Sequence, residues 1–395
     1  MSKILEGVRV ADFGKYIDAP YCASLLADFG AEVIRVEDVG GGVDRRVVPL
    51  GEEDAGASFF ACNHNKKSLS LNTTTDEGKK VFAKLISSVD VVIASLPPRA
   101  LAAAGLDYET LRAIKPDIIL TSVNAFGSGG PWSDRVGFDG VAQAMSGLCY
   151  MTGYPGDPQK AYGPYVDFST GMFAALGTMG AIQWKQKTGE GQHVEAAMVL
   201  AALVPAMPLL TEQGVTNINR KPAGNRSQVG APADMFSTKD GGRFIMQVSG
   251  DDMYRRWAKL MGDETLMTDP RFKTDGTRVR EGGFLSQRMQ EWSSQQTLDE
   301  ALTALAKAKL PTGPVLKPQE VLEHEHLQAL RTFDWGDYPG MPHAAPMLRP
   351  PVRLSGSPLK DPTPPPLAGA DTNSVLSDLG FDSAQINALR ENGIV

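Results

Sequence analysis

The sequence predicts an α/β protein in which a doubly wound, Rossmann-like large domain is joined to a small α+β domain. Over the first 125 residues, segments with helical spacing alternate with short apolar runs, as in successive βαβ units. The apolar runs are continuous, which is typical of parallel strands covered by helices on both faces. The chain has 395 residues, more than the ~250–300 that one core normally holds, so a second domain is expected.

The first strand–helix–strand unit is the clearest. Pro20 suits the first turn of a helix, because its missing N–H needs no partner there, and Gly30 is placed to end that helix. The same alternation continues along the next ninety or so residues. We expect strands at 8–13, 32–36, 89–94 and 118–123, and helices between Pro20 and Gly30, at 75–88 and at 108–114.

The middle of the chain is rich in alanine and glycine, with helical spacing over 139–210. Its most apolar stretch, 196–210, contains two prolines and is shorter than the ~18 residues that a membrane span needs. We therefore expect a buried helix there and no membrane partner. Turn residues at 239–242 predict a β-hairpin over 233–249.

Composition shifts suggest where the domains begin and end. A polar stretch with proline and glycine predicts a linker, and the proline-rich segment 311–366 predicts a long extended connection. The predicted parts are the first part of the large domain at 1–210, a linker at 211–232, the small α+β domain at 225–315 and a return to the large domain at 316–395.

The overall composition excludes several classes of protein. The net charge of −7 argues against a nucleic-acid partner, since phosphate binding needs a basic surface. The three cysteines form no CxxC pair and the N-terminus has no apolar run of a signal peptide, so a cytoplasmic location is expected. Scattered histidines predict no metal site, and the lack of a G-x-G-x-x-G turn or P-loop predicts no nucleotide redox cofactor.

Eight segments, taken in order, resemble landmarks of the family III CoA-transferases, the group that includes the formyl-CoA:oxalate and carnitine CoA-transferases. Among them, Tyr165-Val-Asp-Phe-Ser-Thr-Gly171 is similar to the segment that carries the family's catalytic aspartate. The segments cover nearly the whole chain and lie at 5–37, 65–71, 137–147, 165–171, 187–192, 238–241, 269–272 and 311–314.

The resemblance implies an enzyme that moves CoA from an acyl-CoA donor to a free carboxylic acid acceptor. Coenzyme A would be present as the substrate thioester, and neither ATP nor a metal would be needed. The resemblance also implies a homodimer of two interlocked chains, for which long connections around 211–232 and 311–366 would be required.

Asp167 is the residue that the resemblance assigns as nucleophile. A carboxylate with a pKa near ~3.9 is ionised at neutral pH, so no separate base would be needed to activate it. It would form an aspartyl anhydride and then an aspartyl-CoA thioester. The candidates to stabilise the oxyanions are backbone N–H groups at Ser169, Gly171 and the turn Ser249-Gly250. Without the resemblance, Asp167 would be interpreted as the N-cap of a helix starting at Phe168.

The family's other site positions can be carried over residue by residue. Phe138, Asp139 and Ile17 would lie beside the nucleophile. The CoA contacts would fall on Ile17, Asp18, Arg35, Leu71, Asn72, Thr73, Thr74, Ser95, Leu96, Pro97, Arg135, Val136 and Gly137.

Two departures from the family pattern bear on the reaction. Ile17 replaces a glutamine of the formyl-CoA type, which argues against oxalate and formyl-CoA as substrates. Phe138 stands where the related α-methylacyl-CoA racemases have a histidine that transfers a proton, and phenylalanine has no proton to exchange. CoA transfer is therefore favoured over the alternative, an acyl-CoA isomerase or racemase, and a non-catalytic CoA-binding protein is a third hypothesis.

Overall fold

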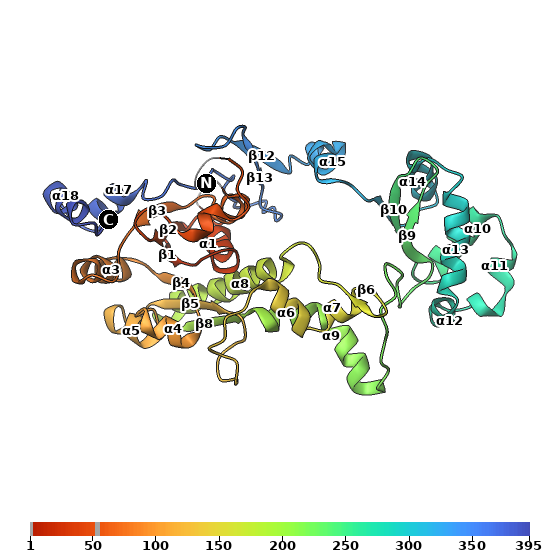
Figure 1. Ribbon diagram of the computed structural model, residues 1–395, viewed down its shortest axis with the longest axis horizontal. Coiled ribbons are helices and arrows are strands. Elements are labelled where there is room, and N and C mark those ends of the chain that lie inside the picture. The colour runs from red at the N-terminus through yellow and green to blue at the C-terminus, as the bar shows by residue number, and fades with distance from the viewer. Residues whose placement is uncertain (1–2, 52–55) are drawn as a thin grey trace. The chain divides into compact units, whose positions relative to one another are not determined.

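A computed structural model describes residues 3–51 and 56–395 of the chain (Figure 1). It divides the chain into two compact units, which we treat separately. The first unit takes in the described residues of Met1–Gly147, Ala161–Thr216 and Gln328–Val395, and the second takes in Leu148–Lys160 and Asn217–Leu327. The predicted domain limits, with a linker at 211–232, stay a prediction.

The first unit is built on a six-stranded parallel sheet, in the order β3-β2-β1-β4-β5-β8. This confirms the predicted α/β class with a parallel sheet. The two outer strands, β3 and β8, were not among the predicted strands. The strands are β1 Arg9–Phe13, β2 Glu32–Glu37, β3 Lys67–Ser70, β4 Val91–Ser95, β5 Ile119–Asn124 and β8 His193–Ala197.

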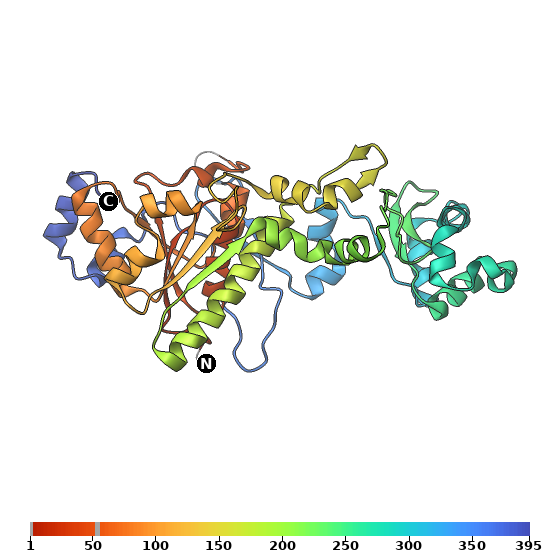
Figure 2. The same ribbon diagram turned by 90° about the horizontal axis from the view of Figure 1, so that it is seen from below.

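Both faces of this sheet are buried, as the continuous apolar runs predict. Along β4, Val91 and Ile93 belong to one core cluster and Val92 and Ala94 to the other, so alternate side chains enter different cores. One face is covered by α1 (Asp18–Asp28) and the long α8 (Tyr165–Thr188), which Figure 2 shows running along the sheet.

The other face is covered by helices from both ends of the chain. Val81 of one helix and Val375 of another share a core cluster with Leu69 and Leu120 of the sheet. The C-terminal helices therefore complete a domain that begins at the N-terminus. The helices on this face are α3 (Asp76–Ser88), α5 (Tyr108–Ile114), α17 (Thr372–Asp378) and α18 (Ser383–Glu391).

The remaining elements of the first unit are shorter, apart from one apolar helix. The apolar helix is α9 (Met198–Thr216), and the segment before β3 holds η1 (Val43–Arg46) and α2 (Ala57–Cys62). The others are α4 (Pro98–Ala103), α6 (Asp139–Met145), β12 (Phe333–Gly336) and β13 (Ala345–Leu348).

The apolar stretch near residue 200 corrects one prediction. The helix α9 is not buried: only about a fifth of its most apolar window is, and Leu200 and Val204 are more than half exposed. Within the described residues it is also the one helix whose length and composition would allow it to cross a membrane, a test that the core helices of soluble proteins pass too.

The second unit contains a three-stranded antiparallel sheet packed against helices. The predicted hairpin is confirmed, since β9 (Ala233–Ser237) pairs with β10 (Arg243–Gln247), and β11 (Thr312–Pro314) joins the other edge of β10. Trp257 is fully buried in the core of this unit, together with Phe236 and Phe244.

Around that sheet lie α10 (Asp251–Met261), α11 (Thr265–Thr268), η2 (Pro270–Phe272), α12 (Asp275–Arg280), α13 (Gly282–Ser293) and α14 (Leu298–Lys307). The unit also holds α7 (Leu148–Met151), β6 (Gly153–Tyr154), β7 (Asp157–Pro158) and α15 (Pro318–Glu323), and α16 (Glu325–Ala329) follows. The expected extended connection over 311–366 is therefore wrong in part, because short helices and strands interrupt it.

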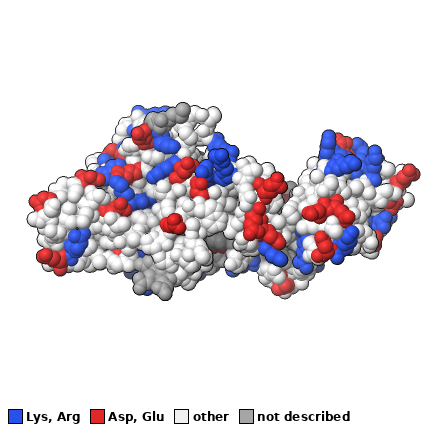
Figure 3. Space-filling view, turned by 90° about the horizontal axis from the view of Figure 1, so that it is seen from above, with Lys and Arg blue, Asp and Glu red and all other residues white. Residues whose placement is uncertain are grey.

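Charged side chains of both signs are interspersed on one face of the protein. On the face that Figure 3 shows, Lys and Arg lie among Asp and Glu, and the part not drawn in grey carries no continuous basic stripe.

Candidate active site

The turn that joins β1 to α1 is held by buried charges. Asp12, at the end of β1, accepts a hydrogen bond from the Gly14 N–H at 2.8 Å through Oδ1, and its Oδ2 accepts one from Lys66 Nζ at 2.7 Å. Tyr16 adopts a left-handed backbone with φ of 68°, which is costly for a residue with a side chain. The turn delivers Ile17 and Asp18 to the start of α1.

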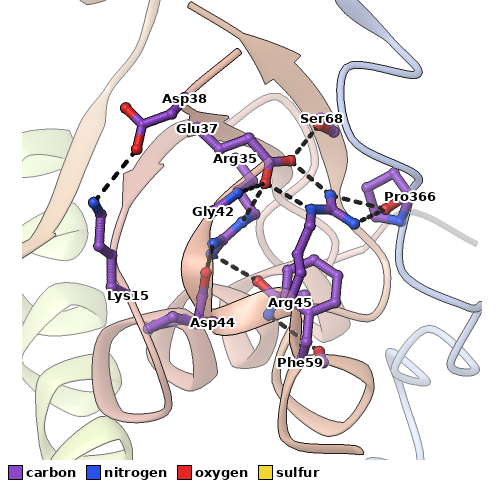
Figure 4. A network of polar contacts seen from close by, with 12 residues as sticks. Lys15, Arg35, Glu37, Asp38, Gly42, Asp44, Arg45, Phe59, Ser68 and Pro366 are labelled. Atoms are coloured by element: carbon purple, nitrogen blue, oxygen red, sulfur yellow. Dashed lines mark hydrogen bonds and ion pairs between the residues drawn. The ribbon is translucent and has the colours of Figure 1, made fainter. Parts of the chain in front are cut away.

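A second network fixes the same turn from the side of β2 (Figure 4). The Arg35 guanidinium donates to both carboxylate oxygens of Asp44 at 2.8 Å and to the Gly14 carbonyl at 3.2 Å. Asp44 in turn accepts a hydrogen bond from the Tyr16 N–H at 3.1 Å. The backbone N–H of Tyr16 is therefore held by the Asp44 carboxylate, which is itself paired with Arg35.

Glu37 and Arg45 complete this network. Arg45 forms a bidentate pair with Glu37, with distances of 2.6 and 2.7 Å, and also donates to the Pro366 carbonyl from the C-terminal part of the chain. Burial alone would raise the pKa of Glu37, but the hydrogen bond from Arg45 and the charge of Arg35 lower it to about 2. These charges are paired within the fold, and among the described residues the Arg35 Nε is the one guanidinium nitrogen of the two arginines that is buried without a hydrogen-bond partner.

Asp167 lies in the first turn of α8. The helix begins at Tyr165 after Pro164, so Asp167 is not the N-cap of a helix starting at Phe168, and that interpretation is wrong. Asp139, at the start of α6, takes the capping role from outside the helix: its Oδ2 accepts hydrogen bonds from the N–H groups of Val166 at 2.7 Å and Asp167 at 3.2 Å. The Asp167 side chain is free to face elsewhere.

The Asp167 side chain reaches a cavity of about 280 Å³ at the carboxyl ends of the parallel strands. The cavity brings together ten of the predicted site residues, from four separate segments of the chain. They are Ile17, Asp18, Ser95, Leu96, Pro97, Arg135, Val136, Gly137, Phe138 and Asp167. The other lining residues are Lys15, Tyr16, Val123, Asn124, Ala125 and Met198.

Those six residues were missed from the sequence, although a general rule would have found them. In open α/β sheets, ligands bind in the crevice beyond the carboxyl ends of the strands. Val123 and Asn124 are the last residues of β5 and Ala125 follows it, Met198 follows β8, and Lys15 and Tyr16 follow β1. A strand prediction that included β8 would have placed all of them at one edge.

Several predicted site residues do not line this cavity. Arg35 is 1% exposed and occupied by Asp44. The segment from Leu71 to Thr74 follows β3, where Leu71 is buried in the core and the Asn72 side chain accepts a hydrogen bond from the Thr74 N–H. The contacts of these residues with CoA stay predictions.

Two of the predicted oxyanion residues belong to the second unit. Ser249 and Gly250 directly precede α10, and the Gly250 N–H donates to Asp275 Oδ2 at 2.8 Å. Their role in the reaction also stays a prediction.

The electrostatics of the cavity correct the assumption that Asp167 is freely ionised at neutral pH. Burial raises the pKa of Asp167 to about 8, and the charges of Asp18 and Asp139 add to the increase. Asp167 is 6% exposed, and its Oδ1 is buried without a hydrogen-bond partner. Burial likewise raises the pKa of Asp18 to about 7. The cavity therefore contains two acids whose charge is poorly stabilised.

Two cations and an aromatic pair also border the cavity. Lys15 lies 3.7 Å from Asp38, and the Arg135 guanidinium stacks over the Trp132 ring at 4.1 Å. Tyr16 and Phe138 meet edge to face, with ring centroids 5.5 Å apart. Within residues 3–51 and 56–395, no cluster of three or more His, Cys, Asp or Glu side chains is arranged to hold a metal ion.

Comparison with known proteins assigns a family to this arrangement. The family model described as CoA-transferase family III matches residues 5–372. Succinyl-CoA–D-citramalate CoA-transferase of Chloroflexus aurantiacus is 32% identical, with 83% of this chain and 82% of the relative covered. Formyl-CoA:oxalate CoA-transferase of a Bradyrhizobium species is 31% identical over all of this chain and 97% of its own.

Two further similarities point the same way. Succinate–glutarate CoA-transferase of Agrobacterium fabrum is 31% identical, with 95% of each chain covered. The crystal structure of a CAIB/BAIF family protein from Brucella suis matches with a TM-score of 0.83 and 30% identity, covering 96% of this chain and all of the other.

Proposed function

The chain belongs to CoA-transferase family III, and we propose that it transfers CoA through covalent intermediates on Asp167. CoA-transferases of this family act between an acyl-CoA and a carboxylic acid. The observation that carries the proposal is the position of Asp167: a buried carboxyl with an unpartnered oxygen, in a cavity that also gathers nine other predicted site residues.

The proposed reaction begins when the ionised Asp167 attacks the thioester carbonyl carbon. The C–S bond breaks, giving an aspartyl–acyl anhydride and CoA thiolate. The thiolate then attacks the Asp167 carbonyl carbon, which releases the donor acid as a carboxylate and leaves an aspartyl-CoA thioester. The acceptor carboxylate follows the same two steps in reverse order, so one thioester is broken and one is made without ATP.

Because the pKa of Asp167 is raised, the empty site is most stable at neutral pH when this carboxyl is protonated. With the pKa near 8, most of the empty sites hold a protonated Asp167 at neutral pH, and only the ionised fraction attacks. An ionised carboxyl that is poorly solvated is also a stronger nucleophile than one in water, since little stabilisation is lost in the attack. The same burial keeps water from hydrolysing an anhydride.

The phosphates of the CoA substrate need positively charged side chains at the cavity. Lys15 and Arg135 line the cavity and supply positive charge there, whereas Arg35 and Arg45 are occupied by Asp44 and Glu37. We assign Lys15 and Arg135 as the first cations to contact CoA. Ser249 and Gly250 remain our candidates for stabilising the oxyanions.

The alternative reaction is proton transfer at the α-carbon of an acyl-CoA, as in an isomerase or racemase. Phe138 lines the cavity and is half-exposed, so the position nearest to that chemistry carries no exchangeable proton. Transfer is the better-supported reaction for this reason.

Relatives suggest which acids to try first. The names of three of them contain citramalate, oxalate and glutarate, all dicarboxylic acids. We propose small dicarboxylic acids as the first substrate panel, with succinyl-CoA as the first donor.

A mass-spectrometric screen tests the proposed function. The protein is mixed with an acyl-CoA and ¹³C-labelled acids, and transfer places the label in a new thioester. If the CoA partner stays unchanged while solvent deuterium enters the α-carbon, the isomerase reaction replaces the transferase reaction. Hydroxylamine added during turnover should convert Asp167 to a hydroxamate, which peptide mapping locates.

We also propose a homodimer, in the cytoplasm, as the working form. The support is an exposed apolar surface on α8 and α9, where side chains recur at helical spacing. Its members are Met172, Phe173, Leu176, Trp184, Leu200, Val204, Met207 and Leu210. A second copy that covers this surface would account for α9 without a membrane. Light scattering after gel filtration measures the mass, and a monomer would contradict the proposal.

A further inference from the structure

The cavity holds two carboxyl groups, although the proposed reaction uses one. Asp18 starts α1 and Asp167 lies in the first turn of α8. Both residues line the same cavity of about 280 Å³. The two helices pack closely here, because a Cβ placed on Gly171, one turn after Asp167, would lie only 2.6 Å from the Asp18 carbonyl oxygen. Asp18 is 5% exposed and Asp167 6%.

The surroundings of the pair do not neutralise it. Lys66, a buried cation that follows α2, is held by Asp12, the Pro20 carbonyl and Asn63. Asp18 Oδ1 accepts a hydrogen bond from the Ala19 N–H at 2.6 Å, and no salt bridge joins Asp18 or Asp167 to a cation of the described residues. Two carboxylates in such a site cannot both be ionised at low cost.

The other charged or titratable groups around the pair are few. They are Asp12 on β1, Cys22 on α1, Cys62 on α2, Lys66 after α2, and Asp139 on α6, with Lys15 and Arg135 at the cavity wall. Burial raises the pKa of the Cys22 and Cys62 thiols far from neutrality, so they stay uncharged. Asp139 is engaged by the Val166 and Asp167 N–H groups and by Gln143.

We propose that Asp18 and Asp167 hold one proton between them in the empty cavity, and that the reactive form of the site carries this proton on Asp18. Asp18 then acts through Asp167, because it accepts the proton that Asp167 must lose before the attack. Asp18 and Asp167 each lie in the first turn of a helix, so the helix N-termini do not decide which of them keeps the proton; the attack requires that Asp167 loses it. In the attack, Asp167 forms a bond to the thioester carbon, CoA leaves as thiolate, and the proton remains on Asp18.

The expected change in kinetics rests on the proposed function, whereas the expected titration of the two carboxyl groups does not. Asp18→Asn is neutral and nearly isosteric with protonated aspartic acid, so it removes the like charge and keeps the shape. We expect the basic limb of the kcat/KM profile, where the wild type loses the shared proton, to move to higher pH by about one unit or more. Asp18→Ser, a second neutral residue that can accept from the Ala19 N–H, should move it the same way.

The matched control is Glu77→Gln on α3, which removes one negative charge from the same unit at a side chain that is more than half exposed. Its basic limb should stay where it is in the wild type. If both Asp18 variants fold and keep the wild-type limb, or if Glu77→Gln moves it equally, the shared proton is disproved.

A titration of the free protein is independent of any catalysis. Infrared spectra of protein carrying ¹³C-labelled aspartate record the protonated carboxyl band between pH 4 and 10. The wild type should show two coupled steps, of which the upper one disappears in both Asp18→Asn and Asp167→Asn, leaving a single step at lower pH. An upper step that persists in Asp18→Asn overturns the inference, even if the transferase reaction is found. Its loss supports the pair even if the transferase reaction is not found.

Discussion

Two groups of buried charges meet at the turn between β1 and α1, and they differ in whether each charge has a partner. In the first group, Arg35 pairs with Asp44 and Arg45 with Glu37, and every pair is at hydrogen-bond distance. In the second group, Asp18 and Asp167 line one cavity, and neither forms a salt bridge with a cation of the described residues. We call these the paired network and the cavity acids.

The difference teaches which buried charges support the fold and which are available for chemistry. Pairing lowers the pKa of Glu37 to about 2 against the effect of burial, whereas burial without pairing raises the pKa of Asp167 to about 8. A buried ion pair is costly to break, but an unpaired acid is costly to keep ionised. Tyr16 connects the two groups. Its N–H donates to Asp44, and two residues later in the chain Asp18 lines the cavity.

The largest expected effect comes from removing the proposed nucleophile. Asp167→Asn should lower CoA transfer by about 10³-fold or more, because asparagine cannot form the anhydride. The same variant should be more stable than the wild type. The folded pKa near 8 exceeds the unfolded value near 3.8, so wild-type stability falls as pH rises from about 4 to about 8, and the variant lacks that loss.

The measurements are a CoA-transfer assay and urea unfolding at pH 5 and pH 8.5. The stability advantage of Asp167→Asn should be larger at pH 8.5. A variant that is inactive and also less stable at both pH values would contradict the distinction between the cavity acids and the paired network.

The next effect concerns the paired network. Glu37→Gln leaves Arg45 buried without its carboxylate, which should lower the free energy of unfolding by about 3–5 kcal/mol. The exposed pair of Lys80 and Glu77 is the matched control, and Glu77→Gln should change stability by less than about 0.5 kcal/mol. Equal losses of unfolding free energy in the two variants would show that burial of an ion pair does not change its contribution to stability.

The pH dependence of the Glu37→Gln effect has the opposite sign to that of Asp167. The folded pKa of Glu37 lies below the unfolded value of 4.5, so its stabilisation is present above about pH 4.5 and is lost as pH falls toward 2. Unfolding of the wild type and of Glu37→Gln should therefore converge in acid. A constant difference down to pH 2.5 would contradict this assignment.

The smallest effect is expected at the junction between the two groups. Arg35→Lys keeps the charge but cannot donate to both oxygens of Asp44 and to the Gly14 carbonyl together. We expect a loss of about 1–2 kcal/mol in stability, with a KM for acyl-CoA that rises more than kcat falls, since the cavity-lining turn loosens. An unchanged KM would show that the turn is held without this network.

Much of the fold could be predicted because local patterns carry it. The strands β1, β2, β4 and β5 are apolar runs next to helices with a clear stripe, so periodicity alone located them. The strands β3 and β8 were missed because Lys67, Ser68 and His193 break the apolar pattern, and their pairing with the sheet is a long-range event. The exposure of α9 was missed because periodicity cannot show what a helix packs against.

By itself, the sequence determined the α/β class with its parallel sheet, the hairpin of the second unit and, through the order of its motifs, the family and the choice of Asp167. Only the tertiary structure decided the charge states. It paired Arg35 with Asp44, removing Arg35 from the cavity, and it brought Asp18 from α1 beside Asp167 of α8. The physical reason is that a pKa depends on burial and on charges distant in sequence, which no local pattern records.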